Sequence, residues 1–311
     1  MWNKVSVRAL LIAVAVMATL YAITFLWGPR TKDRTYRDLV MRLDTAAVTS
    51  FSIRSASQAG STFTFERDPN VQWIVSSGDQ RHRADVQRVN EVLSTCARMK
   101  VKRFVGYIDL VRDRYALADT LKDLILFHLV DGQEIAIEVG RNTFSPGEVG
   151  MWSYVKLPKE NEVFAVESTL SMLTDQPLEE WRPKTLVNGR AEDVIRMSFH
   201  YANDTDFVLW KDTAGWHLDD GPASSIRCDG FTPSLVRAQA HQFADDADVS
   251  GFEVSHSLTV EYASGKEPVT VSVHPTPKGY VVISSLYPER PMVFDAYREL
   301  PRMFRTRQAF L

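Results

Sequence analysis

The chain has 311 residues, and its positive and negative side chains are interspersed, giving a formal net charge of −3. Nucleic-acid-binding proteins usually carry a basic stripe or patch, so this composition indicates no nucleic-acid partner. The two cysteines, Cys96 and Cys228, form neither a Cys-x-x-Cys motif nor a zinc-ligand spacing. We expect both to be buried small apolar residues, and their spacing does not show whether they pair.

The first element is an apolar run over residues 9–27, ALLIAVAVMATLYAITFLW, which contains no charged residue. As a helix it would be about 28 Å long, close to the hydrocarbon thickness of a bilayer. Lys4 and Arg8 precede it, as in a secretory signal, but the apolar core is longer than that of a cleavable signal peptide. The run therefore predicts a retained transmembrane signal anchor. A cleaved peptide is the alternative, whereas a buried core helix would need a polar face that this run lacks.

Positive charges flank both ends of the run, so the orientation depends on more than a charge count. By the positive-inside rule, the basic residues after the run would place the body in the cytoplasm; they are Arg30, Lys32, Arg34 and Arg37. A short tail before an apolar segment is instead typical of an export signal. We expect residues 1–8 in the cytoplasm and the body outside the inner (cytoplasmic) membrane of a bacterium. Small side chains in the run would permit close approach of a partner helix, or are ordinary lipid-facing residues: Ala13, Ala15, Ala18 and Ala22.

The segment 28–46 is charged and is expected to be a linker or a short membrane-proximal helix. From there to residue 180, alternating apolar residues predict a series of short strands. An amphipathic helix is predicted over 84–100, where Val86, Val89, Leu93 and Cys96 recur at helical spacing, and a short helix over 167–173. The strands are expected around 51–53, 63–65, 72–75, 124–130, 135–139, 154–157 and 163–166.

The second half of the body repeats this order of elements. Trp73 and Trp216 each follow a turn at the same point, and Thr232-Pro233 is a plausible start for a second helix over 232–243. The matching strands are expected at 194–201, 207–210, 215–218, 258–262, 269–273, 280–283 and 292–294. The predicted fold is an N-terminal transmembrane helix followed by two similar α+β units, 47–180 and 181–311, each mostly antiparallel sheet with an amphipathic helix. A single large mixed sheet is the alternative.

The common catalytic and cofactor motifs are missing from the sequence. It has no Gly-x-Ser-x-Gly, no phosphate loop, no dinucleotide fingerprint and no His-Glu-x-x-His. Asp246, Asp248, Ser250 and Gly251 match the start of a calcium loop, but Ser257 stands where the loop needs a bidentate Glu. We therefore predict a solvated turn there, no metal, no cofactor, no catalytic residue and no enzymatic activity.

Two basic stretches remain without an assigned role. One is Lys100-Val101-Lys102-Arg103, and the other comprises Arg302, Arg305 and Arg307 near the C-terminus. They could contact lipid headgroups or an acidic partner, or they could form a solvated face.

Several short motifs resemble the family known as domain of unknown function 4340, over residues from about 46 to 300. They are a strand ending in Trp73, the helix start Ala84-Asp85, the triplet Tyr115-Ala116-Leu117, the segment Trp181–Leu186 and Asp193-Val194-Ile195. Ala116 departs from the pattern, because the family usually has Gly there. The resemblance implies a membrane-anchored, extracytoplasmic accessory protein found with ABC transporters of the gliding-motility type, and it carries over no catalytic residue.

The leading hypothesis is a non-enzymatic accessory subunit that contacts the permease and ATPase subunits of an ABC transporter. The alternative is an extracytoplasmic module that binds a glycan or lipid between the two units. Exposed aromatic residues such as Trp152, Trp210 and Tyr287 would serve as its contact residues. A cell-wall hydrolase or transferase is a third hypothesis, for which the sequence shows no nucleophile or acid–base pair.

Overall fold

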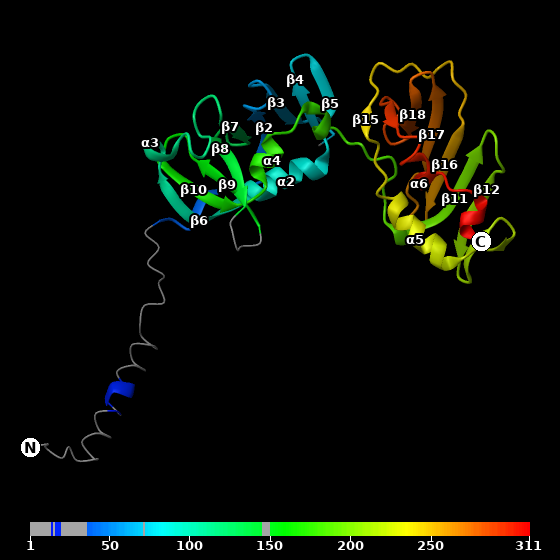
Figure 1. Cartoon of the computed structure of the whole chain (residues 1–311), viewed down its shortest axis with the longest axis horizontal. Coiled ribbons are helices and arrows are strands. Elements are labelled where there is room, and N and C mark those ends of the chain that lie inside the picture. The colour runs from blue at the N-terminus through cyan, green and yellow to red at the C-terminus, as the bar shows by residue number, and fades with distance from the viewer. Residues whose placement is uncertain (1–13, 15, 20–35, 71, 145–149) are drawn as a thin grey trace, which may run out of the picture. The chain divides into compact units, whose positions relative to one another are not determined.

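The computed structural model describes residues 14, 16–19, 36–70, 72–144 and 150–311 (Figure 1). The predicted anchor therefore lies mostly outside the described residues. Ala13, Ala15 and Ala22 are among those not described, and Ala18 is an exposed residue of the short helical stretch 16–19. In the part of the chain that is described, no helix has the length and apolarity needed to cross a bilayer. The anchor stays a prediction.

The described body consists mainly of two sheets in which the paired strands run antiparallel. In strand order, the first contains β1 (Leu39–Arg42), β6 (Arg98–Tyr107), β10 (Glu162–Glu167), β9 (Met151–Lys156), β8 (Glu134–Phe144), β7 (Asp123–Leu129), β2 (Val48–Arg54), β3 (Thr62–Arg67), β4 (Trp73–Ser77) and β5 (Gln80–Arg83). The second contains β15 (Gln242–Phe243), β19 (Met292–Phe294), β18 (Gly279–Ser284), β17 (Val269–Thr276), β16 (His256–Tyr262), β11 (Val194–Tyr201), β12 (Phe207–Asp212), β13 (Gly215–Leu218) and β14 (Gly221–Pro222). The single mixed sheet is therefore wrong.

The two sheets have the same order of strands. Each strand from β2 to β10 has its counterpart nine strands later in the chain, and the counterparts are neighbours wherever the originals are. The helices recur in the same places. Helix α2 (Val86–Ala97) precedes β6 and helix α5 (Ser225–Leu235) precedes β15, while the short helices α4 (Leu170–Thr174) and α6 (Leu300–Met303) follow β10 and β19.

Even the edge of each sheet is covered in the same way. Strand β1 pairs with β6, and the Val101 amide donates to the Asp38 carbonyl at 2.9 Å. In the second half, Thr185 forms an antiparallel bridge with Gln239, and the Ala240 amide donates to the Lys184 carbonyl at 2.9 Å. The sequence predicted most of the strands and their repeated order along the chain, and the structure adds the order in which they pair.

The chain divides into two compact units. Unit 1 is Met1–Gly60 with Glu91–Asp175, and unit 2 is Ser61–Asn90 with Gln176–Leu311, so β3, β4 and β5 are counted with unit 2. In unit 1, α3 (Ile108–Val111) adjoins a small core of Tyr115, Leu117, Trp152 and Tyr154. The remaining short helical turns, η1 (Leu178–Trp181), η2 (Ala191–Asp193) and η3 (Arg307–Phe310), belong to unit 2.

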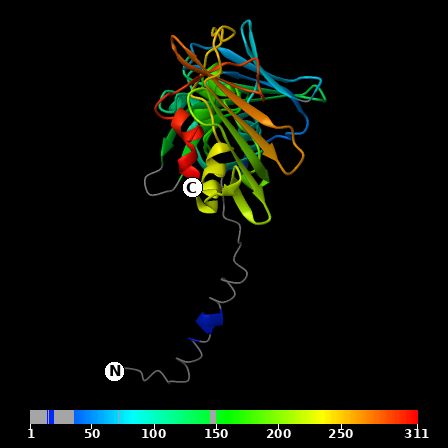
Figure 2. The same ribbon diagram turned by 90° about the vertical axis from the view of Figure 1, so that its right-hand side faces the viewer.

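The core of unit 2 is rich in aromatic rings. Helix α5 buries Cys228, Phe231 and Leu235, which recur at helical spacing and therefore share one face. The Phe231 and Phe310 rings lie 5.3 Å apart between centroids, edge to face, so η3 packs beside α5. Figure 2 shows α5 in yellow next to the C-terminal helical turns in red. This packing places η3 against the buried face of α5.

Three segments differ from the sequence-based expectation. Part of the expected linker 28–46 forms β1, where Val40 and Met41 are buried. The basic stretch 100–103 lies in β6, whose buried Met99 and Val101 alternate with exposed cations. The predicted helix 232–243 is wrong, because α5 begins at Ser225 and places Pro233 near its end. The apolar spacing from Cys228 to Leu235 decides that position, and the residues after α5 instead pair with Thr185 and β19.

Both cysteines are free thiols with fully buried side chains, one on α2 and one on α5. Burial raises the pKa of Cys96 to about 12 and that of Cys228 to about 11. The expectation of buried small apolar residues is confirmed, and neither thiol ionises near neutral pH.

Candidate functional site

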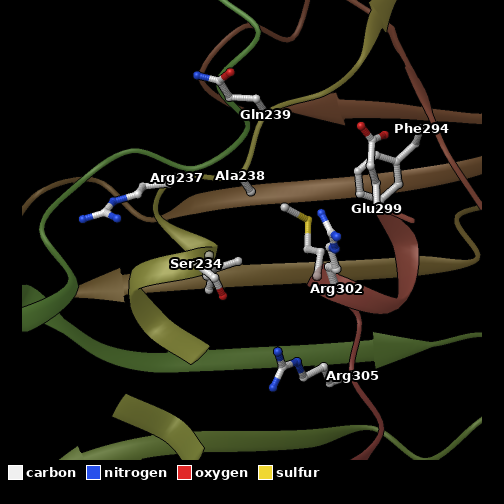
Figure 3. A pocket seen from close by; sticks show the side chains of 10 residues that line it. Ser234, Arg237, Ala238, Gln239, Phe294, Glu299, Arg302 and Arg305 are labelled. Atoms are coloured by element: carbon white, nitrogen blue, oxygen red, sulfur yellow. The ribbon is translucent and has the colours of Figure 1, made fainter. Parts of the chain in front are cut away.

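Unit 2 contains a cavity of about 430 Å³ where the end of α5, the segment after it, the end of β19 and α6 meet (Figure 3). The residues around it are Ser234, Leu235, Arg237, Ala238, Gln239, Phe294, Glu299, Arg302, Met303 and Arg305. We call it the arginine pocket.

Local hydrogen bonds hold the two ends of the arginine pocket in place. After α5, the Ala238 amide donates to the Leu235 carbonyl at 2.9 Å, which closes a turn and leaves Arg237 exposed. Before α6, the Asp295 carboxylate accepts the amides of Tyr297 and Arg298. These bonds are typical of Asx turns, in which a short acidic side chain orders the backbone that follows it.

The floor of the pocket is apolar. Leu235, Phe294 and Met303 are each 3% exposed or less, and they belong to the hydrophobic core of unit 2. A methionine on the floor can adapt its side chain to different apolar groups. The floor therefore suits a small apolar group that enters together with a polar one.

The rim carries three arginines and one glutamate, which leaves two positive charges in excess. Within the described residues, Arg237, Arg302 and Arg305 form no ion pair, although Arg305 lies over the Phe231 ring at 4.9 Å. The Glu299 carboxylate accepts a hydrogen bond from the Asp295 amide at 2.8 Å, so its charge is partly engaged within its own turn. In Figure 3 the three guanidinium groups lie at separate points around the cavity. Guanidinium groups without a carboxylate partner are ready-made donors for an anion.

The structure brings together only some of the residues noted in the sequence. Arg302 and Arg305 meet at the pocket, while Arg307 forms an ion pair with Asp219 at 3.0 Å instead. Arg237 escaped notice, because only the turn after α5 brings it beside the C-terminal arginines. The only sequence signal for it was an arginine without an acidic neighbour within three residues on either side.

The three aromatic residues expected to form a glycan platform have other roles. Trp152 is 8% exposed and belongs to the small core of unit 1, so the expectation of an exposed ring is wrong there. The Trp210 ring stacks on His217 at 4.1 Å and donates to the Asp219 carbonyl at 2.9 Å. Tyr287 is half-buried, with the Arg290 guanidinium 5.0 Å from its ring centre.

Metal-binding groups do not gather in the described residues, where no set of three or more His, Cys, Asp or Glu side chains could hold an ion. In the segment that resembles a calcium loop, the Asp248 carboxylate accepts the Ser250 amide at 2.9 Å as part of a local turn. The chemistry that the arginine pocket itself offers is the binding of an anion.

No protein-family model, curated protein or solved structure matches the chain. The resemblance to the family of unknown function 4340 rests on its short motifs and stays a prediction.

Proposed function

We propose that the protein is a non-enzymatic accessory subunit of an ABC transporter complex. Residues 9–27 anchor it in the inner membrane, the body lies outside the cytoplasm, and it acts through contacts with the permease and its associated ATPase. The supporting sequence features are the uncharged run 9–27 and the motifs shared with the family of unknown function 4340. The predicted architecture is that anchor followed by two similar α+β units.

The observation that carries the proposal is the arginine pocket. Three arginines without an ion pair among the described residues surround an apolar floor, and the excess of positive charge calls for a negatively charged occupant. An acidic segment of a partner protein, with an apolar side chain between carboxylates, would satisfy both the rim and the floor. Arginine pairs with carboxylates through two parallel hydrogen bonds, which gives orientation as well as affinity.

A second candidate function is the binding of an anionic lipid. The observation that favours it is the same combination of cationic rim and apolar floor, which also fits a headgroup with part of an acyl chain. A neutral glycan fits less well, because Trp152 is buried and does not present a stacking face.

The proposal is tested by affinity purification of the tagged full chain in mild detergent, with mass spectrometry of what it retains. We expect a permease and an ATPase to copurify with the wild-type chain. The variant Arg302→Glu reverses a charge at the pocket and should lose them. Lys278→Glu reverses an exposed charge in the turn between β17 and β18 and should retain them.

Two outcomes would count against the accessory subunit. One is repeated recovery of the wild-type chain alone. The other is equal recovery of the transporter with Arg302→Glu and Lys278→Glu, which would remove the arginine pocket from the interface. Copurified anionic lipid that disappears with Arg302→Glu, without any transporter subunit, would support the second candidate instead.

A further inference from the structure

Unit 1 has a cavity of its own, of about 560 Å³, at the place that corresponds to the arginine pocket. It lies where the end of α2, the start of β6 and the end of β10 meet. The polar residues around it are Thr95, Arg98, Lys100, Lys102, Glu167, Ser168 and Thr169. We call it the β6 pocket.

The correspondence follows from the shared topology. In each case the last turn of the long helix supplies a hydroxyl side chain, and an arginine follows three residues later. In each case the residue directly before a short helix, α4 in unit 1 and α6 in unit 2, also lines the cavity. The corresponding pairs are Thr95 with Ser234, Arg98 with Arg237, Lys100 with Gln239, and Thr169 with Glu299.

Both pockets also carry the same charge, although different residues supply it. Each has three basic side chains and one glutamate, so each has an excess of two positive charges. In the β6 pocket all three cations come from alternate, exposed positions of one strand, and in the arginine pocket two come from the C-terminal segment. The net charge is therefore common to both sites, whereas most of the charged side chains are not in matching positions.

The cations of the β6 pocket are only partly neutralised within the chain. Lys102 forms an ion pair with Glu167 at 2.6 Å. Arg98 and Lys100 form none with the described residues of unit 1. Arg98 also lies directly opposite Arg42 in the pairing of β1 with β6. Like charges at such a cross-strand position destabilise a sheet, and a bound anion between them would relieve the repulsion.

We propose that the β6 pocket is a second binding site for the same class of ligand as the arginine pocket, a carboxylate-rich peptide segment that includes an apolar residue. Met99, which is 3% exposed, and the half-buried Met151 provide an adaptable apolar surface beside the cations. The protein then binds two acidic segments per chain. The class of ligand rests on the proposed function, while the site itself rests on the charges and topology of unit 1.

Isothermal titration calorimetry on the full chain in detergent micelles tests the proposal at low ionic strength. The probe is the acetylated and amidated peptide Glu-Glu-Leu-Glu-Glu. We expect two peptides per wild-type chain and one in both Arg98→Glu and Arg302→Glu. The double variant should bind none. The charge-matched controls Lys159→Glu and Lys278→Glu, at exposed positions, should still bind two, and near-ultraviolet circular dichroism should show a native fold in every variant.

The outcomes separate this proposal from the function above. One peptide per wild-type chain, unaffected by Arg98→Glu, would overturn the β6 pocket and leave the arginine pocket standing. Two peptides with no effect of Arg302→Glu would overturn the arginine pocket instead. Equal binding of Gln-Gln-Leu-Gln-Gln would show that carboxylates are not recognised. Binding of inorganic phosphate without binding of the acidic peptide would overturn the peptide class in favour of a phosphate-bearing ligand.

Discussion

At the scale of single residues, Ala116 is one of three described non-glycine residues with a positive φ, together with Ala59 and Asp219. Its φ is 55°, in the left-handed region that an L-residue with a Cβ enters at a cost of about 1–2 kcal/mol. Its neighbours fix that conformation, because the Leu117 amide donates to the Arg112 carbonyl and the Tyr115 carbonyl accepts the Arg141 amide. The chain therefore makes a tight turn at this position, where the family that the motifs resemble usually has Gly.

The variant Ala116→Gly should therefore be more stable than the wild type. Glycine removes the strain but enlarges the freedom of the unfolded chain, so we expect a net gain in the free energy of unfolding of about 0.5–1 kcal/mol. Urea unfolding followed by tryptophan fluorescence measures it. The control is Ala118→Gly, two residues on, where φ is not positive and the same substitution should reduce stability. Destabilisation by both variants to the same extent would contradict the argument.

At the scale of elements, the segment Trp181–Leu186 leads into the second sheet and is tied to the segment after β15. The Arg182 side chain is 3% exposed, donates to both carboxylate oxygens of Asp245 at 2.6 Å, and lies 3.7 Å from the centre of the Phe243 ring. The pKa of Asp245 lies below its ordinary value, mainly because of the hydrogen bonds from Arg182. A buried guanidinium without its carboxylate is costly, so this pair secures the segment.

The variant Asp245→Asn should be destabilised at neutral pH by at least about 1–3 kcal/mol, the usual cost of leaving a buried hydrogen-bond donor unsatisfied. The pKa of Asp245 is lower in the folded state than in the unfolded state. The ion pair therefore makes its full contribution to the free energy of unfolding above the unfolded pKa of about 3.9, and this contribution is lost as the pH falls through the folded pKa. Urea unfolding at pH 7 and at pH 3 should therefore show that the difference in the free energy of unfolding between wild type and variant is smaller at pH 3. An equal difference in the free energy of unfolding at both pH values would show that the ionisation of Asp245 does not cause the destabilisation.

At the scale of the whole molecule, the strand series was predictable because most strands bury one face and so alternate in sequence. Phe51 with Ile53 and Val269 with Val271 show this pattern. Strand β6 was missed because its exposed positions carry a dense run of cations, and β15 because it is two residues long. The two pockets could not be predicted from the sequence for a different reason. Arg237 and Arg302 are 65 residues apart, and only the packing of α5 and α6 on one sheet brings them to one cavity.

The predicted anchor decides whether the whole molecule merely stays near a transporter or contacts it within the bilayer. If residues 9–27 pack on permease helices, their small side chains permit the close approach, because lipid tails offer no competing hydrophobic gain. We expect a chain with larger residues at four of these small positions to lose the copurifying permease while remaining in the membrane fraction. The test compares alanine-to-leucine changes at Ala13, Ala15, Ala18 and Ala22 with leucine changes at Ile12, Val14, Val16 and Ile23. Equal recovery of the permease with both variants would make the anchor a tether and leave recognition to the two pockets.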